Sequence, residues 1–251
     1  MQKLNSELNR LYLQPGANPA GAPALVAADG NTRAITISFN PASGEDDGEH
    51  WTRLCAVANA LQTELGLPAP AVSITGTGYR LWLSLETPMP EAKVAHFLTL
   101  LGAAHPQELD DHAGAGAPAQ LPPYALASGE QWAAFIHPEL GASFASEPAL
   151  DIEPPQAGQA ALLEGLHSIS AQQFAHAMLE LEARQAHTMQ EPEARQAPAP
   201  KAAPSPALEP APAPSAAAPQ DLLLKDATLE DIVRFLHARN IEPTFRHLLP
   251  K

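Results

Sequence analysis

Residues 34–85 carry a strand–helix–strand pattern, and this pattern constrains the fold more than any other feature of the sequence. The segment 35–39 reads Ile-Thr-Ile-Ser-Phe and alternates apolar with polar side chains, as a strand with one buried face does. Residues 49–65 repeat apolar side chains at the spacing of a helix that lies on a sheet, and the residues expected on its buried face are Trp51, Leu54, Ala58, Leu61 and Leu65. Residues 71–85 then contain two strands around a turn at Thr75–Gly78. We therefore expect an α/β (α+β) domain in which helices pack on a sheet.

Further periodic segments extend this domain on both sides. Pro88 and Pro90 are expected to end the second strand before the next helix. The apolar spacing predicts helices at 3–13, 91–101, 159–166 and 170–188, a strand at 131–136 and a hairpin strand at 24–28. We place the boundary of the folded domain at residues 1–188.

The remainder of the chain has a different composition. Residues 189–222 are mostly Ala and Pro, which cannot bury enough apolar area to become ordered, so we expect a disordered, extended linker. Residues 223–251 regain a helical pattern, and so short a module rarely folds alone. This tail is therefore expected to bind a protein partner through one apolar face, formed by Leu229, Ile232, Val233 and Leu236.

The charge of the chain argues against direct binding to duplex nucleic acid. The formal net charge is −14, and residues 24–153 contain sixteen acidic side chains against four lysines and arginines. Proteins that grip nucleic acid neutralise phosphates with clustered basic side chains. The single cysteine, Cys55, permits no internal disulfide, and the sequence shows neither a signal peptide nor a membrane span. We expect a cytoplasmic protein.

Two short motifs in the strand–helix–strand block point to a family. The first strand ends in Ser38-Phe39-Asn40-Pro41, and the turn and following strand read Thr75-Gly76-Thr77-Gly78-Tyr79-Arg80. In this layout the block resembles the archaeo-eukaryotic primase superfamily, in particular the polymerase domain of bacterial DNA ligase D and the primase-polymerases of phages and plasmids. The resemblance covers residues 34–85 and implies a primase-polymerase-like (RRM-like) sheet.

The departures from the family pattern bear directly on activity. The family carries Asp-x-Asp on the first strand, where carboxylates hold divalent ions, and a histidine that contacts the nucleotide phosphates on the later strand. Ser38, Asn40 and Arg80 stand at those places here. The resemblance therefore implies degenerate metal positions at Ser38 and Asn40 and no catalytic residue or cofactor. It also implies a nucleotide-binding set, formed by Thr75, Gly76, Gly78 and Arg80.

Three functions are compatible with these residues. The leading one is a catalytically degenerate primase-like protein with an accessory role in replication or repair, for example of a mobile element, and with a nucleoside triphosphate as ligand. The second is an active Mg- or Mn-dependent nucleotidyltransferase whose metal ligands have moved to the loop acids Asp46, Asp47, Asp110 or Asp111. The third is a protein-interaction scaffold with no nucleotide site.

Overall fold

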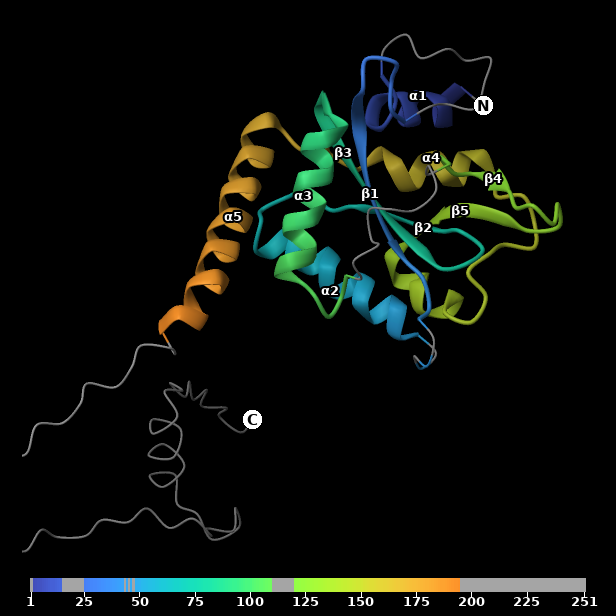
Figure 1. The fold of residues 1–251 in the computed structure, drawn as a ribbon. Helices are drawn as coiled ribbons and strands as arrows, with labels where there is room; N and C mark the ends of the chain where they lie inside the picture. Colours follow the sequence, from blue (N-terminus) through green and yellow to red (C-terminus); the bar gives the residue numbers. More distant parts are fainter. Residues whose placement is uncertain are drawn as a thin grey trace, which may run out of the picture. The chain divides into compact units, whose positions relative to one another are not determined.

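The computed structural model describes residues 2–14, 25–42, 44, 46, 48–109 and 120–194, with side chains described as far as residue 187. This part of the chain is a mixed α/β fold of five strands, five α-helices and one 3₁₀ helix (Figure 1). In chain order the elements are α1 (Gln2–Leu11), β1 (Asn31–Phe39), α2 (Glu49–Thr63), β2 (Ala71–Ile74), β3 (Tyr79–Pro90), α3 (Glu91–Ala104), β4 (Tyr124–Ala125), β5 (Trp132–Ile136), η1 (Pro138–Phe144), α4 (Gln156–Glu164) and α5 (Ala171–Ala194).

The strands form one antiparallel sheet in the order β1-β3-β2-β5-β4. The strands expected at 34–39, 71–85 and 131–136 are confirmed. The hairpin strand expected at 24–28 is much reduced, because its described residues contribute only an isolated bridge between Val26 and Thr32.

Strand β3 continues through the two prolines that were expected to end it. Met89 and Pro90 still pair with Thr32 and Asn31 of β1. The Glu91 N–H donates to the Gly30 carbonyl on the β1 side, so the nitrogen of Pro90, one residue earlier, faces away from β1. A proline is tolerated at such an outward-facing position because no ladder bond is lost there. The expectation of a strand break at Pro88–Pro90 was therefore wrong.

Helices cover both faces of the sheet (Figure 1). Strand alternation sends Leu81 and Leu83 of β3 to one face, where α2, α3 and α5 contribute to the larger apolar core. Trp82 points to the opposite face, where it packs with side chains of α1 and α4 and with Phe135 of β5. The domain is thus a three-layer arrangement with two separate cores.

The helical stripes lie close to their expected positions but are rotated slightly. On α2, Leu54 and Leu61 are buried as expected, while Val57 takes the buried place that Ala58 was expected to hold. On α3 the buried set includes Leu100, whereas Leu98 is only half-buried. A window of periodic residues does not fix the rotation of a helix to better than one position, because neighbouring apolar residues can exchange roles.

Helix α5 extends past the expected end of the domain at residue 188. It continues to Ala194 and so overlaps the first residues of the expected linker, 189–222. Residues 180–191 are rich in Ala, Glu and Gln, which have high helix propensity. The rest of that linker and the tail at 223–251 lie outside the described residues.

The start of α5 carries a reciprocal cap. The Gln173 N–H donates to the Ser170 Oγ at 3.2 Å, and the Ser170 N–H donates to the Gln173 Oε1 at 3.0 Å. This capping box provides acceptors for two backbone N–H groups that have no partner within the first turn of the helix. We expect Ser170→Ala to lower the free energy of unfolding by about 1 kcal/mol in urea denaturation. The same change at exposed Ser143 in η1 is the control, and an equal loss there would contradict the cap.

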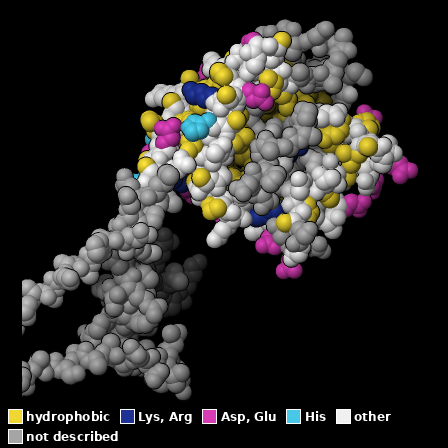
Figure 2. Space-filling model, viewed as in Figure 1, with side chains coloured by type: hydrophobic (Ala, Val, Ile, Leu, Met, Phe, Trp, Pro, Cys, Tyr) yellow, Lys and Arg dark blue, Asp and Glu magenta, His cyan; other side chains and the backbone are white. Residues whose placement is uncertain are grey.

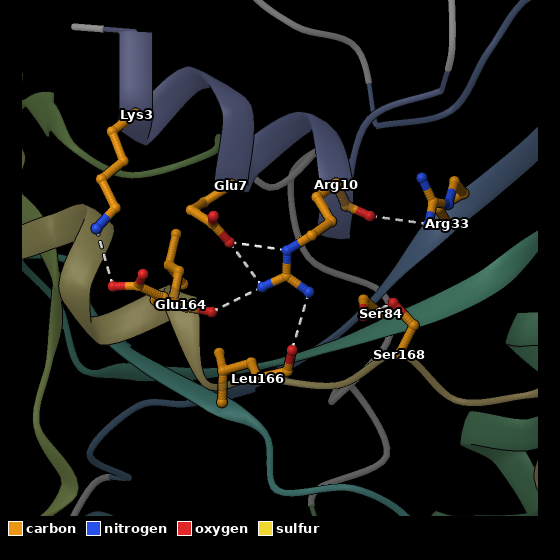
Figure 3. A network of polar contacts seen from close by, with 9 residues as sticks. Lys3, Glu7, Arg10, Arg33, Ser84, Glu164, Leu166 and Ser168 are labelled. Carbon is orange, nitrogen blue, oxygen red and sulfur yellow. Dashed lines mark hydrogen bonds and ion pairs between the residues drawn. The ribbon is translucent and has the colours of Figure 1, made fainter.

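Two arginines connect α1 to α4 and to the sheet through hydrogen bonds (Figure 3). Arg10 of α1 donates to the carbonyls of Leu163 and Leu166 at the end of α4, at 2.9 Å each, and pairs with Glu7. Arg33 of β1 donates to the carbonyls of Arg10 and Leu85. These guanidinium groups complement the negative C-terminal ends of the helices. Both positive charges are thus engaged within the fold.

Candidate functional site

Three polar residues from three strands stand in one row on the sheet. Arg80 of β3 is the register partner of Ser38 on β1 and of Ser73 on β2. Register partners point to the same face, and this row lies on the face that carries Trp82, two residues from Arg80. Ser73 is fully buried and accepts a hydrogen bond from the Trp82 Nε1 at 2.8 Å. Ser38 and Arg80 are half-buried and remain partly accessible.

The guanidinium of Arg80 is held in place without an acidic partner among the described residues. Its Nε donates to the Ser38 Oγ at 3.1 Å, and its Cζ lies 5.9 Å from the centre of the Trp82 ring. Burial lowers the pKa of Arg80 below its ordinary value, and the Tyr124 phenol acts in the opposite direction. A partly desolvated cation whose one hydrogen-bond partner among the described residues is a hydroxyl is an unfavourable arrangement that a bound anion would relieve.

Asn40 lies where the end of β1 meets the turn before β3. Its side chain is exposed, and its Oδ1 accepts a hydrogen bond from the Thr77 Oγ1 at 3.3 Å. Gly78 lies very close to this part of the chain. A Cβ added at Gly78 would lie 2.3 Å from the Phe39 carbonyl oxygen and 2.8 Å from the Asn40 Oδ1. Gly78 is therefore required for the approach of the two strands, a role that the sequence alone does not show.

The backbone of the Thr75–Gly78 turn is occupied by contacts within the protein. The Thr75 N–H donates to the Gly78 carbonyl at 3.0 Å, and the Gly76 N–H donates to the Pro148 carbonyl at 2.8 Å. Gly76 has a φ of +85°, and an added Cβ would lie 2.5 Å from a Leu126 methyl carbon. Thr75 and Gly76 thus have structural roles, so a ligand at this turn would meet side chains rather than these two amides.

Ser38 and Asn40 do not suit a divalent cation. A hydroxyl and an amide oxygen are weak ligands for Mg²⁺ or Mn²⁺, and the positive guanidinium of Arg80 lies within hydrogen-bonding distance of one of them. Asp46 belongs to no group of three or more His, Cys, Asp or Glu that could hold a metal ion in the described part of the chain. Asp47, Asp110 and Asp111 lie outside that part. No metal-dependent step follows from the residues at this site.

Arg53 and Tyr124 were not anticipated from the sequence. Arg53 of α2 donates to the Asn40 carbonyl at 2.9 Å and to the Glu108 carbonyl at 3.2 Å, so it ties the end of β1 to the segment after α3. The Tyr124 phenol, on β4, acts electrostatically on the Arg80 guanidinium. Neither residue lies in a motif, and both interactions depend on how distant elements pack.

The molecular surface shows no large basic area in the view of Figure 2. Lysine and arginine side chains of the described residues appear there as separate small spots, and acidic side chains are more widely spread. Within the described residues no helix is long and apolar enough to cross a membrane. The expected partner-binding face of Leu229, Ile232, Val233 and Leu236 lies outside the described residues.

Comparisons with known proteins leave the family open. No family model matches the chain, and no curated protein is similar enough in sequence to be identified as a relative.

Proposed function

We propose that this protein is a catalytically degenerate relative of the primase-polymerases, with an accessory role in a nucleic-acid transaction such as replication or repair of a mobile element. In this proposal its sheet is the primase-polymerase-like (RRM-like) sheet of that family. The site binds the phosphate of a nucleotide through Arg80 and does not transfer it. The tail recruits a protein partner through the Leu229, Ile232, Val233 and Leu236 face.

The observation that carries the proposal is the environment of Arg80. Its guanidinium is half-buried, stands in register with Ser38 and has no acidic partner among the described residues. A guanidinium presents paired N–H donors that match the oxygens of a phosphate. The resemblance of residues 34–85 to the primase superfamily supports a nucleotide as the source of that phosphate.

The proposed lack of nucleotidyl transfer rests on the same residues. Activation of a 3′-hydroxyl by two divalent ions needs carboxylates at the positions that Ser38 and Asn40 occupy. We therefore expect no manganese-dependent extension of a primed template by the full chain. Robust extension would contradict the proposal and favour the alternative with relocated acids. Assays on the double variants Asp46→Asn/Asp47→Asn and Asp110→Asn/Asp111→Asn would then test those loop acids.

Binding is the direct test of the site. Calorimetric titration of the full chain with nucleotide should show binding in EDTA, and Arg80→Ala should weaken it by about tenfold or more, since a charge-assisted hydrogen bond contributes about 1.5–3 kcal/mol. Arg184→Ala on α5, where the side chain pairs with Glu64, is the matched control and should leave the affinity unchanged. Absence of heat and of any thermal shift with every nucleotide would favour a scaffold without a nucleotide site.

The stability of Arg80→Ala separates a lost ligand contact from a lost fold. The variant removes a partly desolvated charge that has only Ser38 as its hydrogen-bond partner in the described structure. We therefore expect its free energy of unfolding to stay within about 1 kcal/mol of the parent. A large loss of stability would mean that Arg80 is a structural residue.

A further inference from the structure

In the described part of the chain the site has one cation to offer a ligand, and the other basic side chains of residues 24–153 are engaged elsewhere. Residues 24–153 contain four lysines and arginines. Arg33 and Arg53 donate to backbone carbonyls, and Lys93 lies 5.4 Å from the centre of the Phe174 ring in the opposite helical layer. Among the described residues of this span, Arg80 is thus the cation that remains for a ligand, and it stands in the polar row of the sheet.

Among the described residues, the other donors of the proposed site are neutral. Ser38 accepts from the Arg80 Nε and keeps its own hydroxyl proton for a ligand. The Asn40 Oδ1 is taken by Thr77, which leaves the amide Nδ2 as a donor on an exposed side chain. One guanidinium offsets about half of the −1.5 to −2 charge of a terminal phosphomonoester, and the neutral donors can complete its hydrogen bonds.

Additional phosphates would meet no further cation at this site in the described structure. A triphosphate carries about two charges more than a monophosphate, and family members balance such charge with divalent ions that Ser38 and Asn40 do not suit. The same sequence span holds sixteen acidic residues, so each extra negative charge is repelled by the field of the domain. The charge distribution therefore disfavours the triphosphate that the family resemblance implies.

We propose that the Arg80 site, taken as the nucleotide site proposed above, selects a nucleoside monophosphate over the corresponding di- and triphosphates and binds it without a divalent ion. The ligand class is a single terminal phosphomonoester held by Arg80, with Ser38 and Asn40 as neutral donors. The protein would then respond to a product-like nucleotide rather than to a polymerase substrate.

Titration with a phosphate series tests this selection. The full chain is titrated in EDTA and at low salt with the mono-, di- and triphosphates of adenosine, and separately with those of the other three nucleosides. We expect the monophosphate of the preferred base to bind about tenfold more tightly than its triphosphate, a difference of about 1.4 kcal/mol. Added salt should narrow this gap, because repulsion by the acidic surface is screened.

The possible outcomes separate this inference from the proposed function. If a triphosphate binds most tightly in EDTA and Arg80→Ala abolishes that binding, the nucleotide site stands and the monophosphate selection is wrong. If no nucleotide binds, both are wrong. If the monophosphate binds most tightly but Arg80→Ala leaves its affinity unchanged, the inference also fails, because the selecting group lies elsewhere.

A second variant tests the charge argument by adding a positive charge to the site, whereas Arg80→Ala removes one. Asn40→Lys adds a cation at an exposed position two residues beyond Ser38, the register partner of Arg80, and should raise the affinity for triphosphate relative to monophosphate by about tenfold. Gln62→Lys on the exposed side of α2 adds the same charge away from the site and controls for net charge. An equal shift in both variants would show that overall charge, rather than the Arg80 site, determines the preference.

Discussion

Gly78→Ala is expected to lower the free energy of unfolding by about 3 kcal/mol or more, because it forces apart the two strands that form the candidate site. The new Cβ would lie 2.3 Å from the Phe39 carbonyl oxygen and 3.0 Å from the Asn40 Cα. These are backbone atoms of the last residue of β1 and of the residue after it, and they cannot rotate away as a side chain can. Relief of the clash requires β1 to move off β3 at the Phe39–Tyr79 register pair.

A matched control lies on α3. Gly102 is inside the helix, and a Cβ added there meets no heavy atom within 4 Å. Gly102→Ala should therefore raise the free energy of unfolding by about 0.5–1 kcal/mol, since alanine is the better helix former. Urea denaturation of both variants measures the contrast. Similar values for the two would mean that Gly78 has room that the structure does not show.

The Gly78 variant also bears on the ligand site. If enough folded protein remains, the displaced end of β1 should carry Ser38 and Asn40 away from Arg80 and weaken nucleotide binding. Arg53→Met tests the same coupling more gently, because Arg53 donates to the Asn40 carbonyl from α2 without belonging to the sheet. A variant that loses the Arg53 contact yet binds nucleotide normally would show that the position of Asn40 matters little.

Local sequence patterns were sufficient to predict most of the secondary structure. The alternation around Ile35 and Ile37 identified β1, and the spacing of Leu54 and Leu61 identified α2, because burial on one face leaves a period in the sequence. The continuation of β3 through Pro90 was missed because it depends on which side of the strand has a neighbour. That information lies in the sheet order and not in the local sequence.

The candidate site was predictable only as a set of motifs. Ser38 and Arg80 were singled out from the family resemblance, and the structure places them in register with a hydrogen bond between them. The steric role of Gly78 and the contact of Arg53 were not predictable, because both arise where segments distant in sequence meet. The same limit applies to Gln159, a polar residue in a helix that gave no sign of a buried role.

Gln159 of α4 completes the sheet with its side chain, and its loss should be strongly destabilising. The residue is 4% exposed. Its Oε1 accepts from the Phe135 N–H at 2.8 Å, and its Nε2 donates to the Phe135 carbonyl at 2.9 Å. Strand β4 pairs with Ala133 and Trp132 but does not reach Phe135, so the amide of Gln159 replaces the missing neighbour strand there. Few side chains other than an amide can offer a donor and an acceptor together.

Gln159→Leu should therefore lower the free energy of unfolding by about 2–5 kcal/mol, because it leaves a buried N–H and a buried carbonyl of Phe135 without their partners. Gln62→Leu is the control, since the exposed Gln62 amide donates only to the Ala58 carbonyl of its own helix and its loss should cost less than about 0.5 kcal/mol.

Gln159→Glu keeps the shape but loses the N–H donor, and its carboxylate would face the Phe135 carbonyl oxygen. It should therefore resemble the leucine variant at neutral pH and recover part of its stability when the carboxylate is protonated. If Gln159→Glu is as stable as the parent at neutral pH, the paired hydrogen bonds to Phe135 do not hold α4 against the sheet.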